Sequence, residues 1–478
     1  MSVLKEYLRT MATPKKVLWL FFVIGAPVLT AILMIWVFSL HGSYGLFIWF
    51  PVFTYIVIIL IIFATIGPLL ILLDVLRENK EIRSSVKKIA WVFCLICLIV
   101  PITFLCYIGT SLNHPAGDTA PQLLVIDGTG KNDIPDMAVT YWTQAKSKDS
   151  LKWGEGALTD TIKEEKATNS HVFVLDDLEP DTEYYYEING GGKIHKFTTF
   201  PATDDTLRFA VTSDPHFGRS ESRNDITIEI LEQITDSGKN FDIFFMLGDF
   251  VEYGFDDYQW QEGLDAISPY TTKIPFRPVI GNHDTILGGK KYYLDYFYPA
   301  KMPLDTGSRL WYRIDINNIH FFILDLEWGT ETYTAKQKEW FEEEIDNIDK
   351  DDWTIVMSHC FFYSSGNIDG GRSWSDQKPM IDAFEDLFIK NDVDLVFSGH
   401  NHHAEILKKD GIYYQIVGTF GAHPDRKAAI ESDSSEWYMN IEDDDDFGFF
   451  EVDINGNTAT LNFRNRDYDS LKQIVVEQ

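Results

Sequence analysis

Residues 207–216 read Leu-Arg-Phe-Ala-Val-Thr-Ser-Asp-Pro-His, an apolar run that ends in Asp214 and His216. Further along the chain the same pattern recurs, with a short apolar run followed at once by polar residues. The runs cover residues 207–212, 241–247, 276–280, 353–357 and 394–397. Helical stretches lie between several of them. Strands that alternate with helices predict an α/β layered domain whose site lies at the ends of the strands.

The segments between these runs carry local signals of their own. Residues 224–235 place apolar side chains at helical spacing. Thr334 and Gln337 form the pattern of a capping box, which predicts that a helix begins there. Residues 309–316 and 320–324 predict a β-hairpin, and the strand-rich chain after Gly399 predicts a second sheet.

Five polar clusters follow the apolar runs and supply Asp, Asn and His side chains. Oxygen and imidazole donors without a thiolate suit Mn, Fe or Zn. His400 and His402 are two residues apart and project to the same side of an extended segment. The sequence therefore predicts a metal site. The clusters are Asp214-Pro-His216, Gly248-Asp249, Gly281-Asn282-His283-Asp284, His359 and Gly399-His400-Asn401-His402.

Residues 121–203 have a different pattern, with short alternating strands separated by turns. The stretch around Tyr184 resembles the tyrosine corner of fibronectin type III domains, in which a Tyr hydroxyl bonds back to the backbone. We expect a β-sandwich that acts as a spacer and packing partner. The expected strands cover residues 122–126, 137–142, 171–175, 183–189 and 193–199.

The order of the five polar clusters resembles that of the calcineurin-like metallophosphoesterases, over about residues 208–402. The preceding fibronectin III-like region resembles the one that purple acid phosphatases carry. For residues 204–478 the resemblance implies an α/β four-layer metallophosphoesterase sandwich, in which two central sheets are flanked by helices. It also implies two divalent or trivalent metal ions of Mn, Fe or Zn.

The resemblance further implies a role for each polar residue. His283 would be the general acid that protonates the leaving oxygen, and Asp284 would orient its imidazole. Asp249 would bridge the two ions, because one carboxylate can offer an oxygen to each. A metal-activated hydroxide would attack phosphorus. The other ligands would be Asp214, His216 and His402 for one ion, and Asn282, His359 and His400 for the second.

Two departures separate this chain from the purple acid phosphatases. They have Asp-x-Gly where this chain has Asp214-Pro-His216, and a Tyr three residues after the bridging Asp, where this chain has Glu252. That Tyr binds ferric iron and gives the colour. We therefore expect a colourless enzyme, and the substrate range of the acid phosphatases does not transfer.

The N-terminal part is unusually apolar. No Asp, Glu, Lys or Arg occurs between Lys16 and Asp74, nor in residues 89–117. Because about 20 apolar residues of helix cross a bilayer, these runs predict three transmembrane helices at about 17–40, 46–73 and 89–112. A cleaved signal peptide and buried core helices are the alternatives, but the first apolar core is longer than that of a signal peptide.

Basic residues before the first span and in the 74–88 loop predict a cytoplasmic N terminus and an extracytoplasmic catalytic domain, in an integral plasma membrane protein. The fold class predicted for the whole chain is a membrane-anchored multidomain protein. Its expected parts are a membrane anchor at 1–112, a linker at 113–120, the β-sandwich at 121–203 and the metallophosphoesterase domain at 204–478.

The net charge of the chain argues against one class of partner, nucleic acid. It has 41 Lys and Arg against 72 Asp and Glu, for a net charge of −31. Such a surface should repel nucleic acid, so no nucleic-acid binding is expected. The expected partners are a phosphate-ester substrate and, through the three helices, a lipid bilayer.

The function predicted from these observations is hydrolysis of phosphomonoesters or phosphodiesters outside the cytoplasmic membrane. One rival is a metal- or phosphate-binding sensor without turnover, against which the intact Asp249, Asn282 and His283 argue. A second rival is a transporter with an accessory domain. The expected spans contain no charged residue, whereas transport pathways usually need some.

Overall fold

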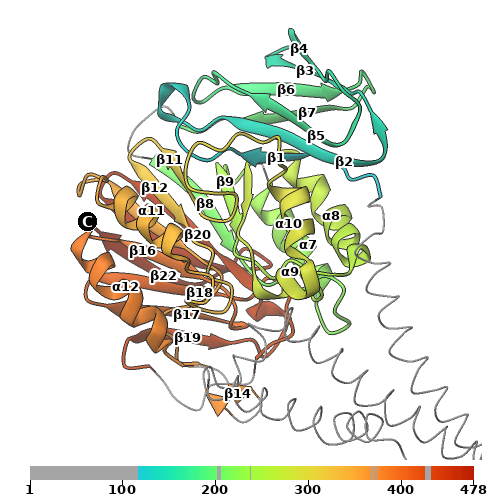
Figure 1. Cartoon of the computed structure of the whole chain (residues 1–478). Coiled ribbons are helices and arrows are strands. Elements are labelled where there is room, and N and C mark those ends of the chain that lie inside the picture. Colours follow the sequence, from blue (N-terminus) through green and yellow to red (C-terminus); the bar gives the residue numbers. More distant parts are fainter. Residues whose placement is uncertain are drawn as a thin grey trace, which may run out of the picture. The chain divides into compact units, whose positions relative to one another are not determined.

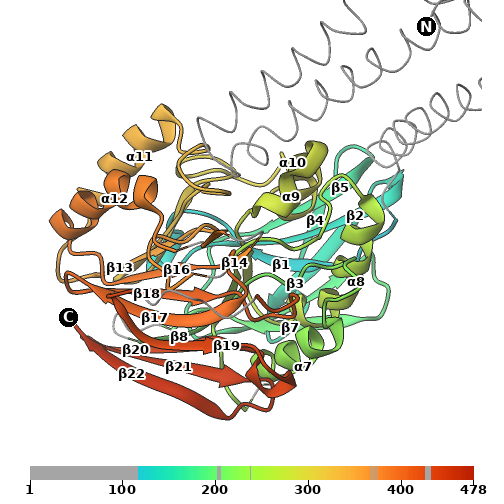
Figure 2. The same cartoon turned by 90° about the horizontal axis from the view of Figure 1, so that it is seen from below.

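Two large β-sheets face each other in the computed structural model, and helices cover their outer sides (Figures 1 and 2). The structure describes residues 117–478 apart from 202–205, 237, 367, 370, 371, 374 and 426–431. Helices α7, α8 and α10 lie beside one sheet, and α11 and α12 beside the other. This is the layered arrangement that the alternating pattern predicts for the catalytic region.

The first sheet has nine strands in the order β22-β21-β20-β8-β9-β10-β1-β2-β5. Its middle strands, β8, β9 and β10, run parallel to one another. The strands are β1 (Gln122–Val125), β2 (Met137–Ser147), β5 (Thr168–Leu175), β8 (Thr206–Thr212), β9 (Ile243–Met246), β10 (Phe276–Pro278), β20 (Gly448–Asn455), β21 (Thr458–Asn465) and β22 (Ser470–Glu477).

The second sheet has seven strands in the order β11-β12-β13-β16-β18-β17-β19. Strands β12, β13 and β16 are parallel, and β11 and β12 form the predicted hairpin. The strands are β11 (Tyr312–Ile316), β12 (Ile319–Ile323), β13 (Trp353–Met357), β16 (Leu395–Ser398), β17 (His403–Lys409), β18 (Ile412–Val417) and β19 (Ser435–Asn440). A two-stranded ribbon, β14 (Ile368–Asp369) and β15 (Arg372–Ser373), lies apart from both sheets.

Aromatic side chains fill the space between the two sheets. The ring of Phe321 lies 5.2 Å from that of Phe209 and 4.8 Å from that of Phe245. Phe397 and Phe450 make a similar contact at 6.2 Å. All five side chains are buried. The alternating apolar runs of the sequence become the inner faces of the sheets because burial of such rings is strongly favourable.

The helices begin and end close to their sequence signals. α7 occupies most of the predicted 224–235 segment, and the side chain of Thr334 accepts a hydrogen bond from Gln337 N at the start of α11. Phe341, Phe384 and Phe388 pack α11 and α12 onto the second sheet. The helices are α7 (Asn224–Ile234), α8 (Asp257–Thr271), α9 (Asn282–Thr285), α10 (Lys290–Phe297), α11 (Ala335–Ile345) and α12 (Lys378–Lys390), with 3-10 turns η2 (Lys131–Asp133), η3 (Ile286–Gly288) and η4 (Asp444–Asp446).

The N-terminal β region differs from the separate fibronectin III-like sandwich that the sequence predicts. β1, β2 and β5 belong to the nine-stranded sheet, because β1 pairs in parallel with β10 at Leu124 and Phe276. Only β3 (Ser150–Glu155), β4 (Asp160–Lys163), β6 (Glu183–Ile188) and β7 (Ile194–Thr198) form a sheet of their own. Pairing with β1 covers an edge of β10 that would otherwise expose unpaired backbone groups. Locally, Glu179 N donates to the hydroxyl of Tyr184 (3.1 Å).

Buried polar contacts fasten this β region to the catalytic layers. Tyr186 donates a hydrogen bond to Thr272 O (2.9 Å), across more than 80 residues of sequence. The carboxylate of Asp127 accepts from the hydroxyl of Tyr298 and from Asp305 N. The region is therefore packed against the catalytic layers.

The membrane-anchored architecture is corrected by the structure. In the part of the chain that the structure describes, no helix combines the length and the apolar content needed to cross a bilayer. The longest, α8, has 15 residues, which at 1.5 Å per residue span about 22 Å against a hydrocarbon core of about 30 Å. The expected spans at 17–40, 46–73 and 89–112 lie outside the described residues. The supported fold class is the metallophosphoesterase fold, and the predicted location in the plasma membrane is corrected together with the membrane-anchored fold class.

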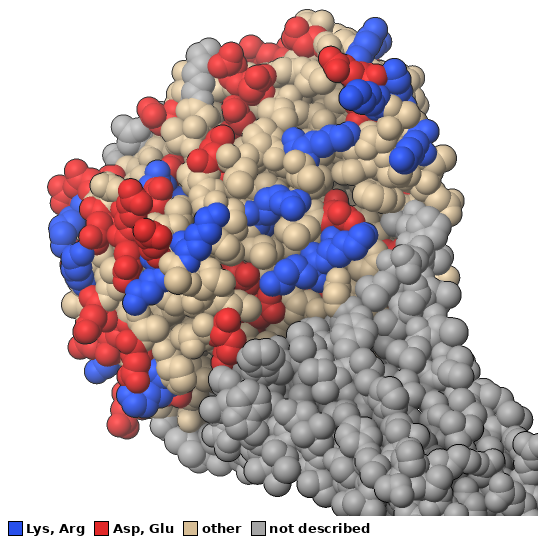
Figure 3. Space-filling model, viewed as in Figure 1, with Lys and Arg blue, Asp and Glu red and all other residues tan. Residues whose placement is uncertain are grey.

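Charged side chains are unevenly spread on the face in Figure 3. Acidic groups gather on its left, on the side of α11 and α12, and basic groups cross its middle between acidic ones. The sequence of α11 includes three consecutive glutamates at positions 342–344. On this face, acidic groups are therefore densest on the side of α11 and α12.

Candidate dinuclear metal site

Five strand ends bring the predicted polar residues together. In each sheet the parallel strands end at the same edge, and a polar cluster follows at that edge. Asp214 follows β8, Asp249 follows β9, Asn282 opens α9 after β10, His359 follows β13, and His400 and His402 lie between β16 and β17. Residues up to 188 positions apart in the sequence therefore meet in one place.

The backbone at these positions is strained. Asp214, His216, Asp249 and His400 have positive φ angles of 64°, 47°, 51° and 70°. Side chains other than Gly rarely adopt this region, although Asp, Asn and His tolerate it best. Such conformations cost free energy and cluster at functional sites. Here they turn the side chains inward immediately after each strand.

The glycines beside the predicted ligands allow the strand ends to approach one another. A Cβ atom on Gly248, whose φ is 96°, would lie 2.7 Å from the backbone of Gly281 and from Nδ1 of His359. A Cβ on Gly399 would lie 2.5 Å from Oδ2 of Asp214. Any larger residue would push the clusters apart, which explains why Gly precedes Asp249 and His400.

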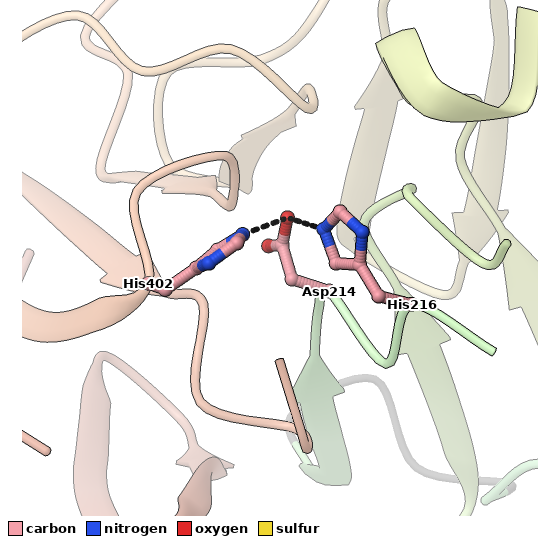
Figure 4. A group of neighbouring side chains, drawn as sticks. All are labelled: Asp214, His216 and His402. Atoms are coloured by element: carbon pink, nitrogen blue, oxygen red, sulfur yellow. Dashed lines mark ion pairs between the residues drawn. The ribbon is translucent and has the colours of Figure 1, made fainter. Parts of the chain in front are cut away.

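The first group of donors, called site 1, consists of Asp214, His216 and His402 (Figure 4). Oδ1 of Asp214 lies 3.7 Å from Nε2 of His216 and 3.6 Å from Nε2 of His402. Atoms that bind one ion at about 2.1 Å are about 3 to 3.5 Å from one another. The spacing of site 1 is slightly wider than that range and fits one ion between the three side chains.

The second group, called site 2, consists of Asn282, His359 and His400. Oδ1 of Asn282 lies 2.9 Å from Nε2 of His359 and 2.8 Å from Nδ1 of His400. The two imidazole nitrogens are 3.2 Å apart. Site 2 therefore presents one amide oxygen and two ring nitrogens to a common point. His400 also connects the two sites, because its backbone N–H donates a hydrogen bond to Oδ2 of Asp214 (3.0 Å).

Asp249 lies between the two sites and uses its two oxygens differently. Oδ2 is 3.5 Å from Nε2 of His216 in site 1 and 3.3 Å from Nε2 of His359 in site 2. Oδ1 accepts a hydrogen bond from His283 N (2.8 Å). A single oxygen, Oδ2, therefore faces both sites, whereas the prediction from the resemblance has one oxygen for each ion.

Two properties of these donors suit metal ions: some of their buried atoms have no hydrogen-bond partner, and their surroundings are negatively charged. Oδ1 of Asp214 and Nε2 of His216 are buried and have no hydrogen-bond partner among the described residues, which is costly without an ion. Burial alone would lower the pKa of His216, but the carboxylates of Asp214 and Glu252 outweigh it and raise the pKa to about 10. Burial alone would also lower the pKa of His359, but the carboxylate of Asp249 outweighs it and raises this pKa to about 9. The cluster thus attracts positive charge.

His283 lies at the mouth of the site. Its side chain is 25% exposed, and its Nδ1 donates a hydrogen bond to the backbone oxygen of Glu252 (2.7 Å). Nε2 is then the ring nitrogen left to face a substrate. Burial lowers the pKa of His283, and the nearby Asp249 raises it only in part.

Asp284 has a different position from the one the sequence predicts. Its carboxylate is fully buried and accepts from Gly281 N (2.9 Å) and Val251 N (3.2 Å). Burial, with the repulsion of Asp249, raises the pKa of Asp284 to about 8. Asp284 therefore holds the backbone turn that carries Asn282, and the group that orients the ring of His283 is the carbonyl of Glu252.

The other ring nitrogen of several ligands is also held. Nδ1 of His359 donates to Leu247 O (2.7 Å) and Nδ1 of His402 to His423 O (2.8 Å). Nδ1 of His216 instead lies 2.8 Å from a carboxylate oxygen of Glu252. Such partners fix the ring orientation and raise the basicity of a ligating imidazole. The sequence signal for Glu252 was its place three residues after Asp249.

A buried polar network behind the site was missed by sequence reasoning. Glu405 accepts hydrogen bonds from Ser365 N (2.9 Å) and pairs with His403 (3.2 Å). The hydroxyl of Ser364 accepts a hydrogen bond from the side-chain amide of Asn401 (3.1 Å), which lies between the candidate ligands His400 and His402. The same hydroxyl also contacts Glu405. This network joins the loop after His359 to the turn that carries the other two histidines. No motif pointed to it, because its partners are distant in sequence.

The chain is similar to known phosphoesterases. Residues 207–404 match the family of calcineurin-like phosphoesterases. The chain is 26% identical over 330 residues to probable purple acid phosphatase 20 of Arabidopsis thaliana, covering 62% of this chain and 73% of that protein. It is 25% identical to probable inactive purple acid phosphatase 27 of the same plant, over 49% of this chain and 43% of that protein.

The fold is also similar to a solved structure. A purple acid phosphatase from seeds of yellow lupin (Lupinus luteus) superposes with a TM-score of 0.61 at 18% identity, covering 76% of this chain and 75% of that one. Residues 207–404 therefore form a calcineurin-like metallophosphoesterase domain that is similar to purple acid phosphatases. The protein is a metal-dependent hydrolase acting on phosphoester bonds. Domains of this kind use a dinuclear centre of Fe, Zn or Mn, and sites 1 and 2 supply candidate ligands for it.

Proposed function

We propose that the protein hydrolyses phosphomonoesters or phosphodiesters at sites 1 and 2, with Asp214, His216 and His402 holding one ion and Asn282, His359 and His400 the other. The observation that carries this proposal is the position of Asp249, whose Oδ2 lies 3.5 Å and 3.3 Å from a donor nitrogen of each site. A carboxylate oxygen shared in this way is suited to two ions close together.

In the proposed reaction the bound ions, His283 and Asp249 have different roles. The chemistry supplied by two bound ions is a water of lowered pKa and positive charge beside the phosphoryl oxygens. His283 donates the proton from Nε2 to the leaving oxygen, while its Nδ1–H stays on Glu252 O. Asp249 Oδ1 holds the backbone of His283, so the acid and the bridging ligand keep a fixed separation.

A second candidate function is binding without turnover, as a metal- or phosphate-dependent sensor. The observation in its favour is that two of the relatives are named as probably inactive. Against it, the chain retains Asp249, Asn282 and His283, and Asp249 accepts a hydrogen bond from His283 N while Asn282 contacts His359. Purified full-length protein, loaded in turn with Mn, Zn and Fe and offered panels of monoesters and diesters, distinguishes the two. Absence of turnover with every metal would favour the sensor.

The role of His283 is tested by the change His283→Ala. With the acid removed, turnover of esters with alkoxide leaving groups should fall by about 10²- to 10⁴-fold. Hydrolysis of a nitrophenyl phosphate should fall much less, because its leaving group needs little protonation. Both ions should remain bound, since His283 belongs to neither site. Rates for both esters and metal content per chain are the measurements.

His320→Ala is the matched control, because that ring is held by Asp315 and Asp352 on the second sheet. It should change neither rate. An equal loss for alkyl and nitrophenyl esters in His283→Ala would remove the acid role from this residue.

A further inference from the structure

The short helix α9 carries two residues of the site, the candidate ligand Asn282 and the candidate acid His283, yet it has only four residues. A helix of one turn is not stable by itself in water, because one or two backbone hydrogen bonds do not offset the ordering of the chain. The position of the His283 ring therefore depends on the contacts that hold α9 from outside.

The backbone of His283 is held by the loop that follows β9. Its N–H donates a hydrogen bond to Oδ1 of Asp249 (2.8 Å), and its carbonyl accepts one from Gly254 N (2.9 Å). Asp249 and Gly254 both lie after β9, a strand of the nine-stranded sheet. These two contacts fix α9 to the first sheet, and neither of them reaches the second sheet, which carries His359 and His400.

The C-terminal end of α9 is held from the second sheet. The hydroxyl of Thr285, the last residue of α9, lies 2.9 Å from Oε2 of Glu327 and 3.0 Å from the backbone oxygen of Asn282. Glu327 comes shortly after β12, a strand of the seven-stranded sheet. Of the two acceptors for the single hydroxyl proton, a carboxylate forms the stronger hydrogen bond. Thr285 therefore connects α9 to the second sheet.

The carboxylate of Glu327 is buried and is itself held in place. Its Oε1 lies 2.6 Å from the ammonium of Lys290, the first residue of α10, so Glu327 contacts the chain on both sides of η3. Just before Glu327, the backbone oxygen of Leu326 accepts a hydrogen bond from Cys360 N (2.9 Å), next to the candidate ligand His359. Glu327 is thus a fixed point that belongs to the second sheet.

This connection between the sheets matters for proton donation. The candidate ligands that would hold an ester at sites 1 and 2 come from both sheets, whereas His283 is placed by α9. A general acid must lie within about 3 Å of the oxygen that it protonates, and a displacement of about 1 Å can cost about 10²-fold in rate. A contact that fixes α9 against the second sheet keeps the acid at the required distance from the leaving oxygen.

We propose that Glu327 is a positioning residue that acts through the hydroxyl of Thr285 and holds His283 in place for proton donation. The inference rests on the proposed phosphoesterase function and on the acid role of His283. Neither Glu327 nor Thr285 belongs to the five polar clusters of the sequence. The competing role for the pair is general stabilisation of the fold, which would affect every ester alike.

The test removes each member of the pair in metal-loaded full-length protein. Thr285→Val keeps the shape of the side chain without its hydroxyl, and Glu327→Ala removes the carboxylate. Each change should lower turnover of butyl phosphate by about 10- to 100-fold. Hydrolysis of nitrophenyl phosphate should fall much less, as in His283→Ala, and both ions should remain bound. Thr285→Ser, which restores the hydroxyl, should recover most of the lost turnover.

The double variant and hydrogen exchange show whether the two residues act together. Because Glu327 acts through Thr285, the double variant should lose no more turnover of butyl phosphate than the more affected single variant, whereas independent contributions would multiply. Hydrogen exchange gives a readout without turnover. The backbone amides of residues 282–288 should exchange about 10-fold faster in each single variant, since one anchor of α9 is lost.

Thr235→Val is the matched control for Thr285→Val. The hydroxyl of Thr235 also lies near a backbone oxygen at the C-terminal end of a helix, Leu231 O of α7 (2.8 Å). Thr235 lies in the connection that leads to the start of β9, at the opposite end of that strand from Asp249. Its replacement should change neither the ratio of the two rates nor the exchange of residues 282–288.

Four outcomes would overturn the inference and leave the phosphoesterase function standing. They are equal losses for butyl and nitrophenyl phosphate in Thr285→Val, loss of metal in that variant, multiplied losses in the double variant, and unchanged exchange of residues 282–288. The proposed function is judged on the unmodified protein alone. If that protein hydrolyses neither ester with Mn, Zn or Fe, the proposed function fails, and the inference that rests on it fails as well.

Discussion

Sites 1 and 2 are built from similar side chains but differ in charge. Site 1 contains the carboxylate of Asp214, and a second carboxylate, that of Glu252, lies 2.8 Å from Nδ1 of its ligand His216. Site 2 contains the neutral amide of Asn282, and Nδ1 of its ligand His359 contacts a backbone carbonyl. The carboxylate of Asp249 faces both sites. Site 1 therefore places more negative charge around its ion.

This difference in charge predicts that the two sites bind their ions with unequal affinity. A ligating imidazole backed by a carboxylate is a stronger donor than one backed by a carbonyl. Site 1 has the charge of Asp214 in addition to that of Asp249, whereas site 2 adds only the neutral amide of Asn282 to Asp249. We expect site 1 to hold its ion more tightly and site 2 to lose its ion first.

The largest effect is expected where the two sites meet. Asp249→Asn removes the charge that both ions share, so occupancy of both sites should fall. Turnover should fall by about 10³-fold or more, because ions in such centres supply several kcal/mol of stabilisation to the transition state. Metal content per chain and kcat for one ester are the measurements.

Asp453→Asn is the control for this change, since that carboxylate is half-exposed at the far end of β20 and contacts Arg208. It should retain two ions. A fully occupied Asp249→Asn protein would show that sites 1 and 2 do not depend on a shared ligand.

An intermediate effect is expected from the group behind site 1. Glu252→Gln keeps the size of the side chain but removes its charge, and the affinity of site 1 for its ion should fall by about 10- to 100-fold. In a titration with a chelator, the unmodified protein should lose its two ions in separate steps. The steps should merge in the variant, because the advantage of site 1 is reduced.

Glu221→Gln provides the comparison for Glu252→Gln. Both glutamates contact the guanidinium of Arg219, but Glu221 is exposed and lies away from His216. Its replacement should leave the two steps as they are. If the steps remained equally separated in Glu252→Gln, the carboxylate would not be the source of the difference between the sites.

The smallest effect on metal binding is expected from Glu405, in the buried polar network behind the turn that carries His400 and His402. Burial alone would raise the pKa of Glu405, but His403 and Ser365 outweigh it and hold the pKa below its usual value. Glu405→Gln weakens these contacts, so the free energy of unfolding should fall by about 1–3 kcal/mol. Because the network connects the loops that carry His359 and His400, metal affinity should also fall, by up to about 10-fold.

Glu451→Gln separates the two effects of Glu405→Gln. Glu451 is also buried and is paired with Arg208 and Arg464 in the nine-stranded sheet. Its replacement should lower stability without a change in metal affinity. Equal metal affinity in both variants would reduce Glu405 to a structural residue. Denaturant unfolding and metal titration are the two readouts.

Much of the catalytic region was predictable because its signals are local. The strands that precede Asp214, Asp249 and His359 were expected from short apolar runs, and Thr334 caps α11 as its motif predicts. The hairpin of β11 and β12 was also expected. The role of Asp284 was predicted wrongly, since adjacency to His283 in the sequence does not place its carboxylate on that ring. The membrane-anchored fold class drawn from uncharged runs was corrected as well.

The N-terminal β region shows why sheet membership was harder. The apolar residues that follow Gln122 predict a strand at 122–126, but such a run does not specify which strands lie beside it. The partner of β1 is β10, some 150 positions later, and that pairing joins the region to the catalytic sheet. Which strand lies at the open edge of a sheet is a property of the assembled layers.

By itself the sequence determined the kinds of donor and their order along the chain, because Asp, Asn and His at the ends of buried strands are chemistry that each segment carries alone. Only the tertiary structure decided that one oxygen of Asp249 faces both sites, that Glu252 lies behind His216, and that Trp328 lies against His400. Each of these is a contact of a few ångströms, and each joins the ends of different strands. Their geometry depends on how the two sheets pack, since the packing of buried rings such as Phe209 and Phe321 sets the separation of the edges at which the donors meet.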